Sequence, residues 1–582
     1  MKKLLTGNEA IARGAWEAGV TFASAYPGTP STEITEAISK YEEVHAEWAP
    51  NEKVAFESAI GASFGGVRTL VCMKHVGLNV AADPFCTLSY TGVNGGLVLI
   101  CADDPAMHSS QNEQDNRYYA RLAKVTMLEP SSSQEAKDYV KLAFQLSEKY
   151  DTPVMVRVTT RISHSRGIVE LEKRKNVKQK PFVKDPQKYV MVPVNARMRH
   201  RVVEARQAMV RDYAEASPIN EIEKGRGDIG VISAGVAYQY AREVFPEAHF
   251  LKLGITNPLP VKMIKKFAKG KKKLYVVEEL EPFMEEQIKA QGISVIGKEK
   301  LPVIDELNPD VVRDSFIKRR KPHVSEDVSR LPKRPPNLCP GCPHRALFSS
   351  IKPLKPIVFG DIGCYTLSVL PPLSMHDSCV CMGASIGVSY GYSKVGANDT
   401  TPSVGVLGDS TFLHSGLTGV LQMAYNKGMN TVIILDNRTT AMTGGQQHPA
   451  TGKTLKGDET NAVDFEELCK AMGVKRVFTV NPFEIKKTRE LVKKEMKIEE
   501  PSIVISRAPC PLIYRVRTTP FQVDPDKCKE CGMCLKINCP AITRTGNKAT
   551  IVEHMCNGCS VCSQICAFNA ISRVKSGKKC SV

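Results

Sequence analysis

Cysteine is the residue type that this chain places at the most regular intervals. Twelve of its 19 cysteines fall into three sets of four, and eight of these twelve lie in the last 60 residues. Two successive runs read C-x2-C-x2-C-x4-C and C-x2-C-x2-C-x3-C, namely Cys528, Cys531, Cys534, Cys539 and Cys556, Cys559, Cys562, Cys566. Closely spaced cysteines on a tight loop, with one cysteine from elsewhere, are the ligands of an iron–sulfur cube. The runs therefore predict two 4Fe-4S clusters and the transfer of single electrons.

The spacing also predicts which cysteines share a cube. In two-cluster ferredoxins the fourth cysteine of each run ligates the cluster of the other run. The expected sets are Cys528, Cys531, Cys534 with Cys566, and Cys556, Cys559, Cys562 with Cys539. Zinc ribbons are the alternative, but they use two knuckles of two cysteines each. Cys566 is followed by Ala567 instead of the usual proline, which is expected to alter the potential or lability of that cluster without removing a ligand.

Length and composition describe a large globular protein. The 582 residues predict about four domains, each able to bury its own core. The content of 42% hydrophobic and 24% charged residues is ordinary for a soluble chain. No apolar run approaches the roughly 18 residues of a membrane span, and Thr6, Asn8 and Glu9 interrupt the apolar start at once. We therefore expect a cytoplasmic protein whose cysteines serve metal or redox chemistry.

The formal net charge of +18 raises the question of a nucleic-acid partner. Lys and Arg are spread along the chain, and no recognition motif accompanies them, so no nucleic-acid partner is expected. Two interpretations stay open. A basic surface near an electron exit would steer an acidic carrier such as a ferredoxin, or the charge is simply a solvated surface.

The elements that must position these residues alternate between apolar strands and helical stretches. Residues 1–165 are expected to form an α/β domain with buried parallel strands at 67–73, 96–101 and 153–158. The charged residues 166–225 predict a surface connector. A second α/β domain is expected over 226–305, with strands at 229–233, 250–253 and 273–278.

The second half of the chain repeats this alternation and then ends in the cysteine runs. Residues 306–337 are expected to form a linker, because Lys, Arg and Pro dominate their second half. A third α/β domain is predicted over 338–515, with strands at 357–359, 403–407, 431–435 and 502–506. The predicted fold class is therefore α/β, with several doubly wound parallel-sheet domains and a ferredoxin-like α+β domain over 519–582.

Polar residues follow two strands of the third domain. Gly408-Asp-Ser410 comes directly after the strand at 403–407, and Asn437 follows the strand at 431–435. Because parallel strands end at one edge of a sheet, these hard oxygen ligands are expected to meet there and to hold Mg²⁺. A helix amino terminus at the same edge favours phosphate groups. The alternative is an ordinary turn after each strand.

These motifs resemble those of the thiamine-diphosphate-dependent 2-oxo acid:ferredoxin oxidoreductases. The segment Asp436-Asn-Arg-Thr-Thr-Ala-Met-Thr-Gly-Gly-Gln446 is similar to the corresponding loop of the pyruvate enzymes. By that resemblance, Asp409, the Asn437 side chain and the Thr439 carbonyl hold Mg²⁺ on thiamine diphosphate, and Gly408 and Met442 lie beside the cofactor. The resemblance makes 338–515 the pyrophosphate-binding domain, 1–165 the pyrimidine-binding domain and 226–305 a transketolase-C-terminal-like domain.

Two motifs of the first domain resemble the same family. Ala25-Tyr-Pro-Gly-Thr-Pro-Ser-Thr32 is similar to the family motif Y-P-x-T-P-S, whose threonine approaches the substrate, and this role falls to Thr29. The segment beginning Asn51-Glu-Lys resembles the one that carries the cofactor-activating glutamate. We assign that role to Glu57, with Glu52 as the competing candidate. Such a glutamate favours the imino tautomer of the aminopyrimidine, which generates the nucleophilic ylid.

The third set of cysteines also resembles the family pattern. Cys339-Pro-Gly-Cys342, Cys364 and Cys510 match the spacing of the cysteines that hold a proximal cluster. A third 4Fe-4S cluster is therefore expected, because strand-end positions in one sheet converge. By itself, C-x2-C is equally compatible with zinc or a redox pair.

Resemblance covers essentially the whole chain and is closest to the α subunits of the indolepyruvate ferredoxin oxidoreductase branch, which share the segments 73–84 and 339–345. It implies a catalytic subunit that converts an arylpyruvate such as indolepyruvate, with CoA, to arylacetyl-CoA, carbon dioxide and reduced external ferredoxin. It also implies a smaller β subunit in an α2β2 assembly. Gly28 and Met442 replace bulkier or more polar residues of the pyruvate enzymes, which favours an apolar aromatic side chain.

Three rival functions stay open at this point. The nearest is the same chemistry on pyruvate or a branched 2-oxo acid. A non-catalytic polyferredoxin subunit is another, although an inactive domain need not keep Glu57, Asp409 and Asn437. A non-oxidative decarboxylase is the third, and it would have no use for three clusters.

Overall fold

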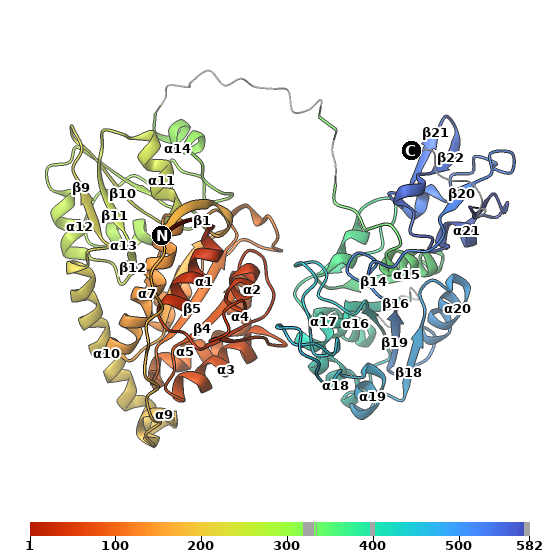
Figure 1. Ribbon diagram of the computed structural model, residues 1–582, viewed down its shortest axis with the longest axis horizontal. Coiled ribbons are helices and arrows are strands. Elements are labelled where there is room, and N and C mark those ends of the chain that lie inside the picture. Colours follow the sequence, from red (N-terminus) through yellow and green to blue (C-terminus); the bar gives the residue numbers. More distant parts are fainter. Residues whose placement is uncertain (318–330, 333–334, 396–401, 575–582) are drawn as a thin grey trace. The chain divides into compact units, whose positions relative to one another are not determined.

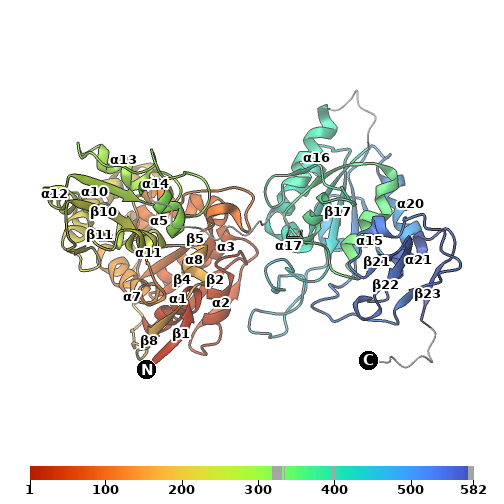
Figure 2. The ribbon, with the colours of Figure 1, turned by 90° about the horizontal axis from the view of Figure 1, so that it is seen from above.

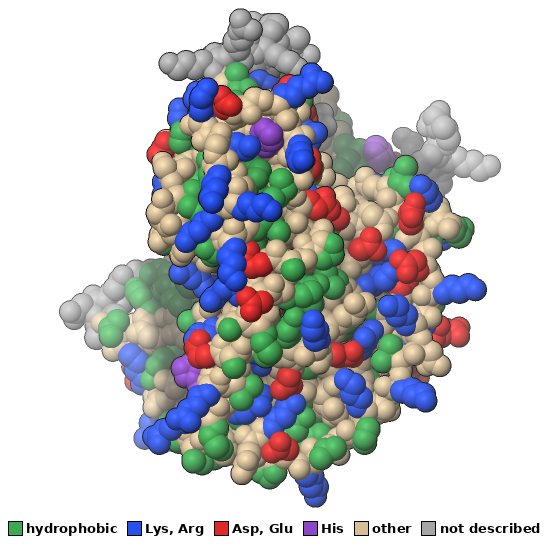
Figure 3. Space-filling model, turned by 90° about the vertical axis from the view of Figure 1, so that its left-hand side faces the viewer, with side chains coloured by type: hydrophobic (Ala, Val, Ile, Leu, Met, Phe, Trp, Pro, Cys, Tyr) green, Lys and Arg blue, Asp and Glu red, His purple; other side chains and the backbone are tan. Residues whose placement is uncertain are grey.

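The computed structural model describes residues 1–317, 331–332, 335–395 and 402–574. The chain divides into two compact units, residues 1–326 and 327–582 (Figure 1). Among the described helices, none combines the length and apolar character needed to cross a bilayer. On the face drawn in Figure 3, Lys and Arg side chains are spread among acidic ones instead of gathering in one patch.

The first unit is built on a seven-stranded sheet of order β12-β6-β7-β5-β4-β2-β3, parallel except for the pair β12–β6. Its strands are β2 (Phe22–Ala25), β3 (His45–Trp48), β4 (Thr69–Lys74), β5 (Leu97–Asp103), β6 (Thr126–Leu128), β7 (Val154–Thr159) and β12 (Ile255–Asn257). The three strands predicted for this domain are confirmed as β4, β5 and β7. All three are buried along their whole length, as expected for parallel strands covered on both faces.

Helices of the first unit connect these strands and cover the sheet. Helix α1 packs against α7, and α3 against α5. The helices over this part of the chain are α1 (Gly7–Glu17), α2 (Thr32–Ile38), α3 (Glu52–Phe64), α4 (His75–Val80), α5 (Ala82–Thr91), α6 (Arg117–Ala123), α7 (Ser133–Tyr150) and α8 (Thr160–His164).

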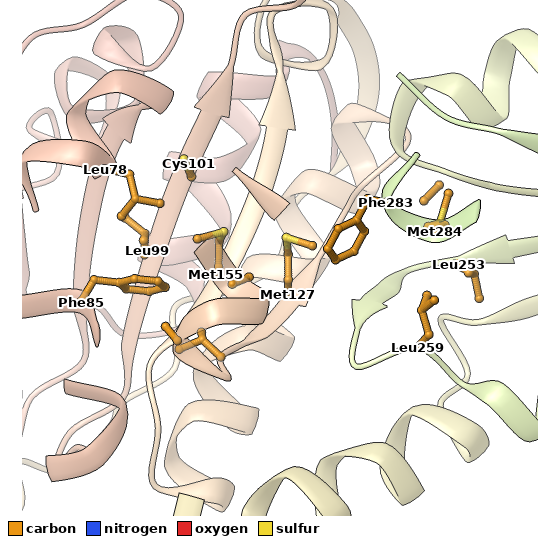
Figure 4. Close-up of a cluster of buried hydrophobic side chains, with 14 of the residues drawn as sticks. Leu78, Phe85, Leu99, Cys101, Met127, Met155, Leu253, Leu259, Phe283 and Met284 are labelled. Atoms are coloured by element: carbon orange, nitrogen blue, oxygen red, sulfur yellow. The ribbon is translucent and has the colours of Figure 1, made fainter. Parts of the chain in front are cut away.

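The second predicted domain has one buried cluster of its own and shares another with the first domain. Its sheet has the order β13-β10-β11-β9 and consists of β9 (Glu221–Glu223), β10 (Ile229–Ala234), β11 (His249–Leu253) and β13 (Lys273–Val277). Met127 and Met155 of the first sheet and Leu253, Phe283 and Met284 of the second region belong to one buried cluster (Figure 4). Because β12 also joins the first sheet, the ranges 1–165 and 226–305 form one compact unit.

The predicted connector and linker are more structured than expected. In the connector, β8 (Arg166–Glu170) pairs with β1 (Lys2–Thr6), and α9 (Pro186–Tyr189) and α10 (Pro193–Ala216) follow. The predicted linker 306–337 begins with α14 (Pro309–Phe316), which packs on α11 (Gly235–Val244). Helices α12 (Val261–Ala268) and α13 (Phe283–Lys289) complete the unit. Residues 318–330 and 333–334 of the expected linker lie outside the described residues.

The second unit contains a fully parallel six-stranded sheet of order β15-β14-β16-β17-β19-β18. Its strands are β14 (Ile357–Gly360), β15 (Ser378–Cys379), β16 (Ser403–Gly408), β17 (Thr431–Asp436), β18 (Arg476–Val480) and β19 (Ser502–Arg507), which confirms the four predicted ones. Side chains of α15 (Pro343–Ile351) and α20 (Ile485–Glu495) pack on one face. Helices α16 (Ala384–Val395), α18 (Leu417–Tyr425) and α19 (Phe465–Ala471) lie on the other face (Figures 1 and 2), where their side chains form a separate buried cluster.

The cysteine runs form a small α+β module at the end of the second unit. It contains two antiparallel strand pairs, β20 (Phe521–Val523) with β23 (Ile571–Arg573) and β21 (Ile542–Thr545) with β22 (Lys548–Ile551), and the short helix α21 (Val561–Ile565). Its buried cluster includes Ala346 and Ile485 of the preceding domain. The module is therefore packed on the third α/β domain, and residues 575–582 of its predicted range lie outside the described residues.

Candidate functional site

The first unit brings several polar residues together at the carboxyl edge of its large sheet. Thr29 follows β2, and its carbonyl oxygen accepts a hydrogen bond from Ser109 Oγ (3.1 Å), which follows β5. Lys74 ends β4, and its Nζ donates to the Ser109 carbonyl (2.9 Å). A Cβ added at Gly28 would lie 3.4 Å from the Lys74 side-chain methylenes. The space that glycine was expected to open beside Thr29 is therefore bordered by the Lys74 stem.

The two candidate glutamates lie on different sides of α3. The Glu57 side chain is 46% exposed and forms an ion pair with Lys53. Glu52 is only 4% exposed, in the first turn, where Asn51 Oδ1 caps the helix by accepting from Val54 N–H (2.9 Å). Five residues of an α-helix rotate the side-chain direction by about 140°, so the two carboxyl groups cannot share one environment. The geometry favours Glu52 over our choice of Glu57.

Glu52 lies against Gly77 of α4, the helix that follows β4. A Cβ added at Gly77 would lie 2.7 Å from Glu52 Oε1, so glycine leaves the room that this carboxyl group occupies. Burial lowers the pKa of the Lys74 ammonium to about 8, although the charges of Asp104 and Glu52 oppose the shift. Burial and the charge of Lys74 also lower the pKa of His75 to about 4, so its imidazole is neutral at pH 7. This edge therefore gathers ionisable groups in a poorly hydrated environment.

The second unit places the predicted magnesium ligands at one sheet edge. Asp409 begins the helical stretch after β16, and Asn437 follows β17. Backbone N–H groups of Ser410 and Arg438 each donate to one carboxylate oxygen of Asp409, both at 2.8 Å. Each oxygen keeps a lone pair that a cation can use. The residues therefore fit a Mg²⁺ ion, with buried Thr439 beside them.

Two histidines that the sequence analysis missed border this edge. Asn437 Nδ2 donates to His344 Nε2 (3.2 Å), which leaves the Asn437 amide oxygen with the N–H of Thr439 as its partner (3.3 Å). Burial lowers the pKa of His344 to about 4 despite the charge of Asp409, so His344 is a neutral acceptor. His448 Nε2 lies 3.2 Å from Asp409 Oδ2. The sequence could have indicated His344, because it lies two residues after Cys342 in the segment 339–345, which resembles the family.

The loop that follows Asn437 is held by its own side chains. Thr440 N–H donates to the Gln446 carbonyl (3.0 Å), and Thr443 Oγ1 donates to Gln446 Oε1 (2.5 Å). Gly444 and Gly445 have φ values of 126° and 93°, which explains the two glycines of the Thr-Gly-Gly-Gln ending. Met442 projects from this loop and is 49% exposed within the second unit.

The third set of cysteines converges behind the Asp409 edge. Cys342 precedes α15, Cys364 follows β14, and both belong to one buried cluster. Burial, together with the negative charges of Cys510 and Cys339, raises the pKa of the Cys364 thiol to about 11, so the three thiols lie near one another. The N–H of Cys510 donates to the Asn437 carbonyl (3.0 Å). The predicted magnesium and proximal cluster sites therefore share a strand end.

The ferredoxin-like module contains two cavities whose walls divide the eight cysteines into the two predicted sets. One cavity is lined by Cys528, Cys531, Cys534 and Cys566. The other is lined by Cys539, Cys556, Cys559 and Cys562. Backbone N–H groups of Phe521 and Ala570 donate to Cys556 Sγ and Cys566 Sγ, both at 3.4 Å. These thiols fit the ligand sets of two cubes.

A single metal ion has no comparable site in the part of the chain that the structure describes. No group of three or more His, Cys, Asp or Glu side chains converges closely enough to hold one ion. The predicted cluster sites and the predicted magnesium site both differ from a single ion held by protein side chains alone. A four-iron cube holds its ligand sulfurs farther apart than one ion does, and a diphosphate-bound Mg²⁺ takes part of its shell from the phosphates.

Two family models match separate parts of this chain. The thiamine-diphosphate-binding model of pyruvate flavodoxin/ferredoxin oxidoreductases matches residues 13–226, which contain the Thr29, Glu52 and Lys74 edge. The C-terminal TPP-binding domain of thiamine pyrophosphate enzymes matches residues 361–506, which contain Asp409 and Asn437. The matches assign each sheet edge to one half of a thiamine-diphosphate fold.

Known proteins of similar sequence extend over the whole chain. The indolepyruvate oxidoreductase subunit IorA of Methanothermobacter thermautotrophicus is 43% identical over 98% of this chain and 97% of its own length. The protein of the same name from Archaeoglobus fulgidus is 40% identical over 99% and 98%. Among solved structures, a 2-oxoglutarate:ferredoxin oxidoreductase from Magnetococcus marinus is 17% identical, covers 55% of this chain and 65% of its own, and has a TM-score of 0.47. With the first two matches the expected family resemblance is confirmed, and the chain belongs to the family of indolepyruvate oxidoreductase IorA subunits.

Proposed function

We propose that this chain is the catalytic subunit of an oxidoreductase that converts indolepyruvate and related arylpyruvates, with CoA, to arylacetyl-CoA and carbon dioxide while reducing an external ferredoxin. Relatives that carry the name of this activity match the chain from end to end. One observation carries the proposal. The Asn437 carbonyl accepts the N–H of Cys510, so the predicted cofactor edge and the predicted proximal cluster meet at one strand end.

Each predicted group supplies a part of the reaction that the side chains cannot. When bound, thiamine diphosphate supplies a nucleophilic ring carbon that adds to the keto carbon and accepts the electron pair released with carbon dioxide. Three 4Fe-4S clusters, when bound, carry electrons one at a time. CoA accepts the acyl group.

The second unit has the task of anchoring the cofactor. Asp409, the Asn437 amide oxygen and the Thr439 carbonyl hold the Mg²⁺ ion of the diphosphate, and Gly408 and Met442 border the cofactor. The hydrogen bonds from Ser410 and Arg438 fix the Asp409 carboxylate before the ion binds. His344 fixes the orientation of the Asn437 amide through the bond at its Nε2.

The first unit has the task of moving a proton and of holding the substrate. Glu52, in place of Glu57, exchanges a proton with the aminopyrimidine ring, because its carboxyl group is buried at the sheet edge while that of Glu57 faces solvent and Lys53. Thr29 approaches the substrate from the neighbouring strand end. The ammonium of Lys74 offers a positive charge to the substrate carboxylate at this edge.

The cysteine sets fix where electrons leave the active centre. Cys339, Cys342, Cys364 and Cys510 hold the proximal cluster against the Asn437 strand end. Residues Pro340 and Gly341 of the same loop line the cavity of the set that Cys539 completes. The cluster of that set therefore receives electrons from the proximal cluster. The cluster of the Cys528 set, whose cavity wall includes exposed Met533 and Phe568, then passes them to the external ferredoxin.

The partners follow from the subunit name of the relatives. A smaller β subunit completes the enzyme, in an α2β2 assembly located in the cytoplasm. The decisive experiment is anaerobic turnover by the α chain co-expressed with its β partner, with CoA and a viologen dye as electron acceptor. Indolepyruvate and phenylpyruvate are expected to reduce the dye with carbon dioxide release. Equal or faster turnover of pyruvate would instead assign the chain to the pyruvate branch.

Metal analysis tests the cluster assignment separately. Protein purified without oxygen is expected to contain about twelve iron and twelve sulfide per chain, for three cubes of four. About eight of each would keep the two clusters of the ferredoxin-like module and remove the proximal one.

A further inference from the structure

Arg345 is a buried cation in the first turn of α15, directly after His344. Both side chains are almost completely enclosed, at 2% and 3% exposed, but they have different partners. His344 is bonded to Asn437 of the magnesium edge, whereas Arg345 is bonded to the ferredoxin-like module. The segment that follows Cys342 therefore joins the third α/β domain to the cysteine module.

The guanidinium group of Arg345 joins the backbone around two predicted cluster ligands. Its Nη2 donates to the carbonyl oxygens of Leu338 and Cys339, the latter at 3.4 Å. Its Nη1 donates to the carbonyl of Ile537 at 2.9 Å and to that of Asn538, just before Cys539. One rigid fork thus holds the start of the proximal loop at a fixed place relative to the Cys539 segment.

The proximal loop forms part of the wall of the neighbouring cysteine cavity. Arg345, Pro340 and Gly341 line the cavity of the Cys539 set. The approach is close enough that a Cβ added at Gly341 would lie 2.8 Å from the Cβ of Asn557, which follows Cys556. Arg345 is therefore enclosed between the Cys339–Cys342 loop and the second set of cysteines.

The charge of Arg345 lacks an acidic partner in the described part of the chain. Among the described residues, Arg345 forms no ion pair with a carboxylate, and its Nε has no hydrogen-bond partner. Burial lowers the pKa of the guanidinium, and the negative charges of Cys539, Cys342, Cys559 and Cys339 counteract the shift. A buried cation without an anion is costly, and arginine does not release its proton. The anions whose charges act on it belong to cysteines of both predicted cluster sets.

The cavity of the Cys528 set provides an internal comparison. Its charged lining residues, Lys529 and Glu530, are both exposed and carry opposite signs. Water screens such charges, so their effect on a cluster is small. Of the two repeated cysteine sets, only the one completed by Cys539 has a buried cation in its described wall.

We propose that Arg345 is a positioning residue that sets the reduction potentials of two clusters, those of the proximal set and of the Cys539 set, by stabilising their more negatively charged reduced forms. The proposal rests on the proposed function, because it requires both cubes. It adds no redox step, since Arg345 keeps its proton and its charge throughout.

The test is a potentiometric titration of the anaerobic αβ enzyme, followed by electron paramagnetic resonance. Arg345→Gln is expected to lower the one-electron equilibrium constant for reduction about tenfold or more at two clusters, which corresponds to about 59 mV. The cluster of the Cys528 set, identified by the signal that Cys531→Ser alters, is expected to keep its potential. Arg345→Lys, which keeps the charge, is expected to stay near the wild-type values.

Arg489→Gln is the matched control, because Arg489 also donates to a backbone carbonyl, that of Ser350, at 3.0 Å in the same unit. It is expected to leave all three potentials unchanged. Unchanged potentials in Arg345→Gln, or an equal shift of all three, would overturn the proposal. If Arg345→Gln loses iron, the result for Arg345→Lys decides. Wild-type iron content and wild-type potentials in Arg345→Lys support the role of the charge. Loss of iron from Arg345→Lys, or an equal shift of all three potentials, overturns the proposal. Fewer than three clusters in the wild-type enzyme would instead contradict the cluster assignment of the proposed function, and with it the role of Arg345 at two clusters.

Discussion

The carboxyl edges of the two large parallel sheets hold polar groups of different character. At the edge of the second unit, both oxygens of Asp409 accept backbone hydrogen bonds, and the Asn437 amide is bonded on both sides. At the edge of the first unit, burial shifts the pKa of Lys74 to about 8 and that of His75 to about 4. One edge is preorganised by hydrogen bonds, and the other holds ionisable groups whose pKa values are lowered by burial.

This difference indicates a division of work between the two edges. A carboxylate fixed by N–H groups binds a cation without further reorganisation, which suits an anchor. At the first edge, burial moves the pKa of Lys74 toward the working pH, which suits recognition of charge, and keeps His75 neutral at that pH. Substitutions at the second edge should therefore remove the cofactor, whereas those at the first edge should leave it bound and slow the reaction.

The largest effect is expected from Asp409→Ala at the anchoring edge. Without the carboxylate, Mg²⁺ loses a charged ligand, so the purified variant should lack bound thiamine diphosphate and have only background activity. Cofactor content is measured by chromatography of the denatured protein, and iron content serves as the control for folding. If the variant keeps its full complement of thiamine diphosphate, Asp409 is not a ligand that anchors the cofactor.

The next largest effect is expected from Glu52→Gln at the proton-transfer edge. Loss of the exchangeable proton should lower kcat by roughly a hundredfold or more, as for general acid–base groups, while the cofactor stays bound. The matched control is Glu57→Gln on the same helix, which should leave kcat close to the wild-type value. The opposite result, with Glu57→Gln impaired and Glu52→Gln active, would restore Glu57 as the activating glutamate.

Substrate preference should depend in part on Met442 of the second unit. Burying roughly 100 Å² of an aromatic ring stabilises its complex by about 2.5 kcal/mol, on the order of a hundredfold in kcat/KM relative to pyruvate. Met442→Asn is expected to reduce this preference only in part, because Met442 is half exposed in the second unit and a single side chain covers a fraction of a ring. Comparison of kcat/KM for indolepyruvate and pyruvate checks both statements. Equal values in the wild-type enzyme would contradict the aromatic preference.

The smallest effect is a pH dependence that should belong to the first edge alone. Lys74 is charged below its pKa of about 8 and neutral above it, so attraction for the substrate carboxylate is lost as the pH rises through 8. KM for the 2-oxo acid should then increase by up to about tenfold per pH unit above that value. Lys74→Met should show a raised KM without this dependence. A wild-type KM that is constant between pH 7 and 9 would exclude Lys74 from substrate binding.

Local sequence was sufficient for the parts of the molecule that depend on neighbours along the chain. The spacing of the cysteines predicted the division into Cys528 and Cys539 sets that the two cavities display. The strands before Asp409 and Asn437 were predicted from short apolar runs, and parallel pairing then placed both residues at one edge. The same reasoning missed β2, β3, β6 and β18, which are short or only partly apolar.

Only the tertiary structure decided the features that depend on contacts between distant segments. Our proposal of Glu52 over Glu57 rests on which side of α3 is buried, where Gly77 of α4 leaves room for the Glu52 carboxyl group. The shared core of residues 1–165 and 226–305 arises from Met127 packing near Phe283 and Met284. Nothing in the sequence distinguished Arg345 from the other basic residues by its contacts. Its position between two cysteine sets depends on hydrogen bonds to Leu338 and to Ile537, which is 192 residues away. Burial and electrostatic environment are sums over such neighbours, which the order of residues along the chain does not reveal.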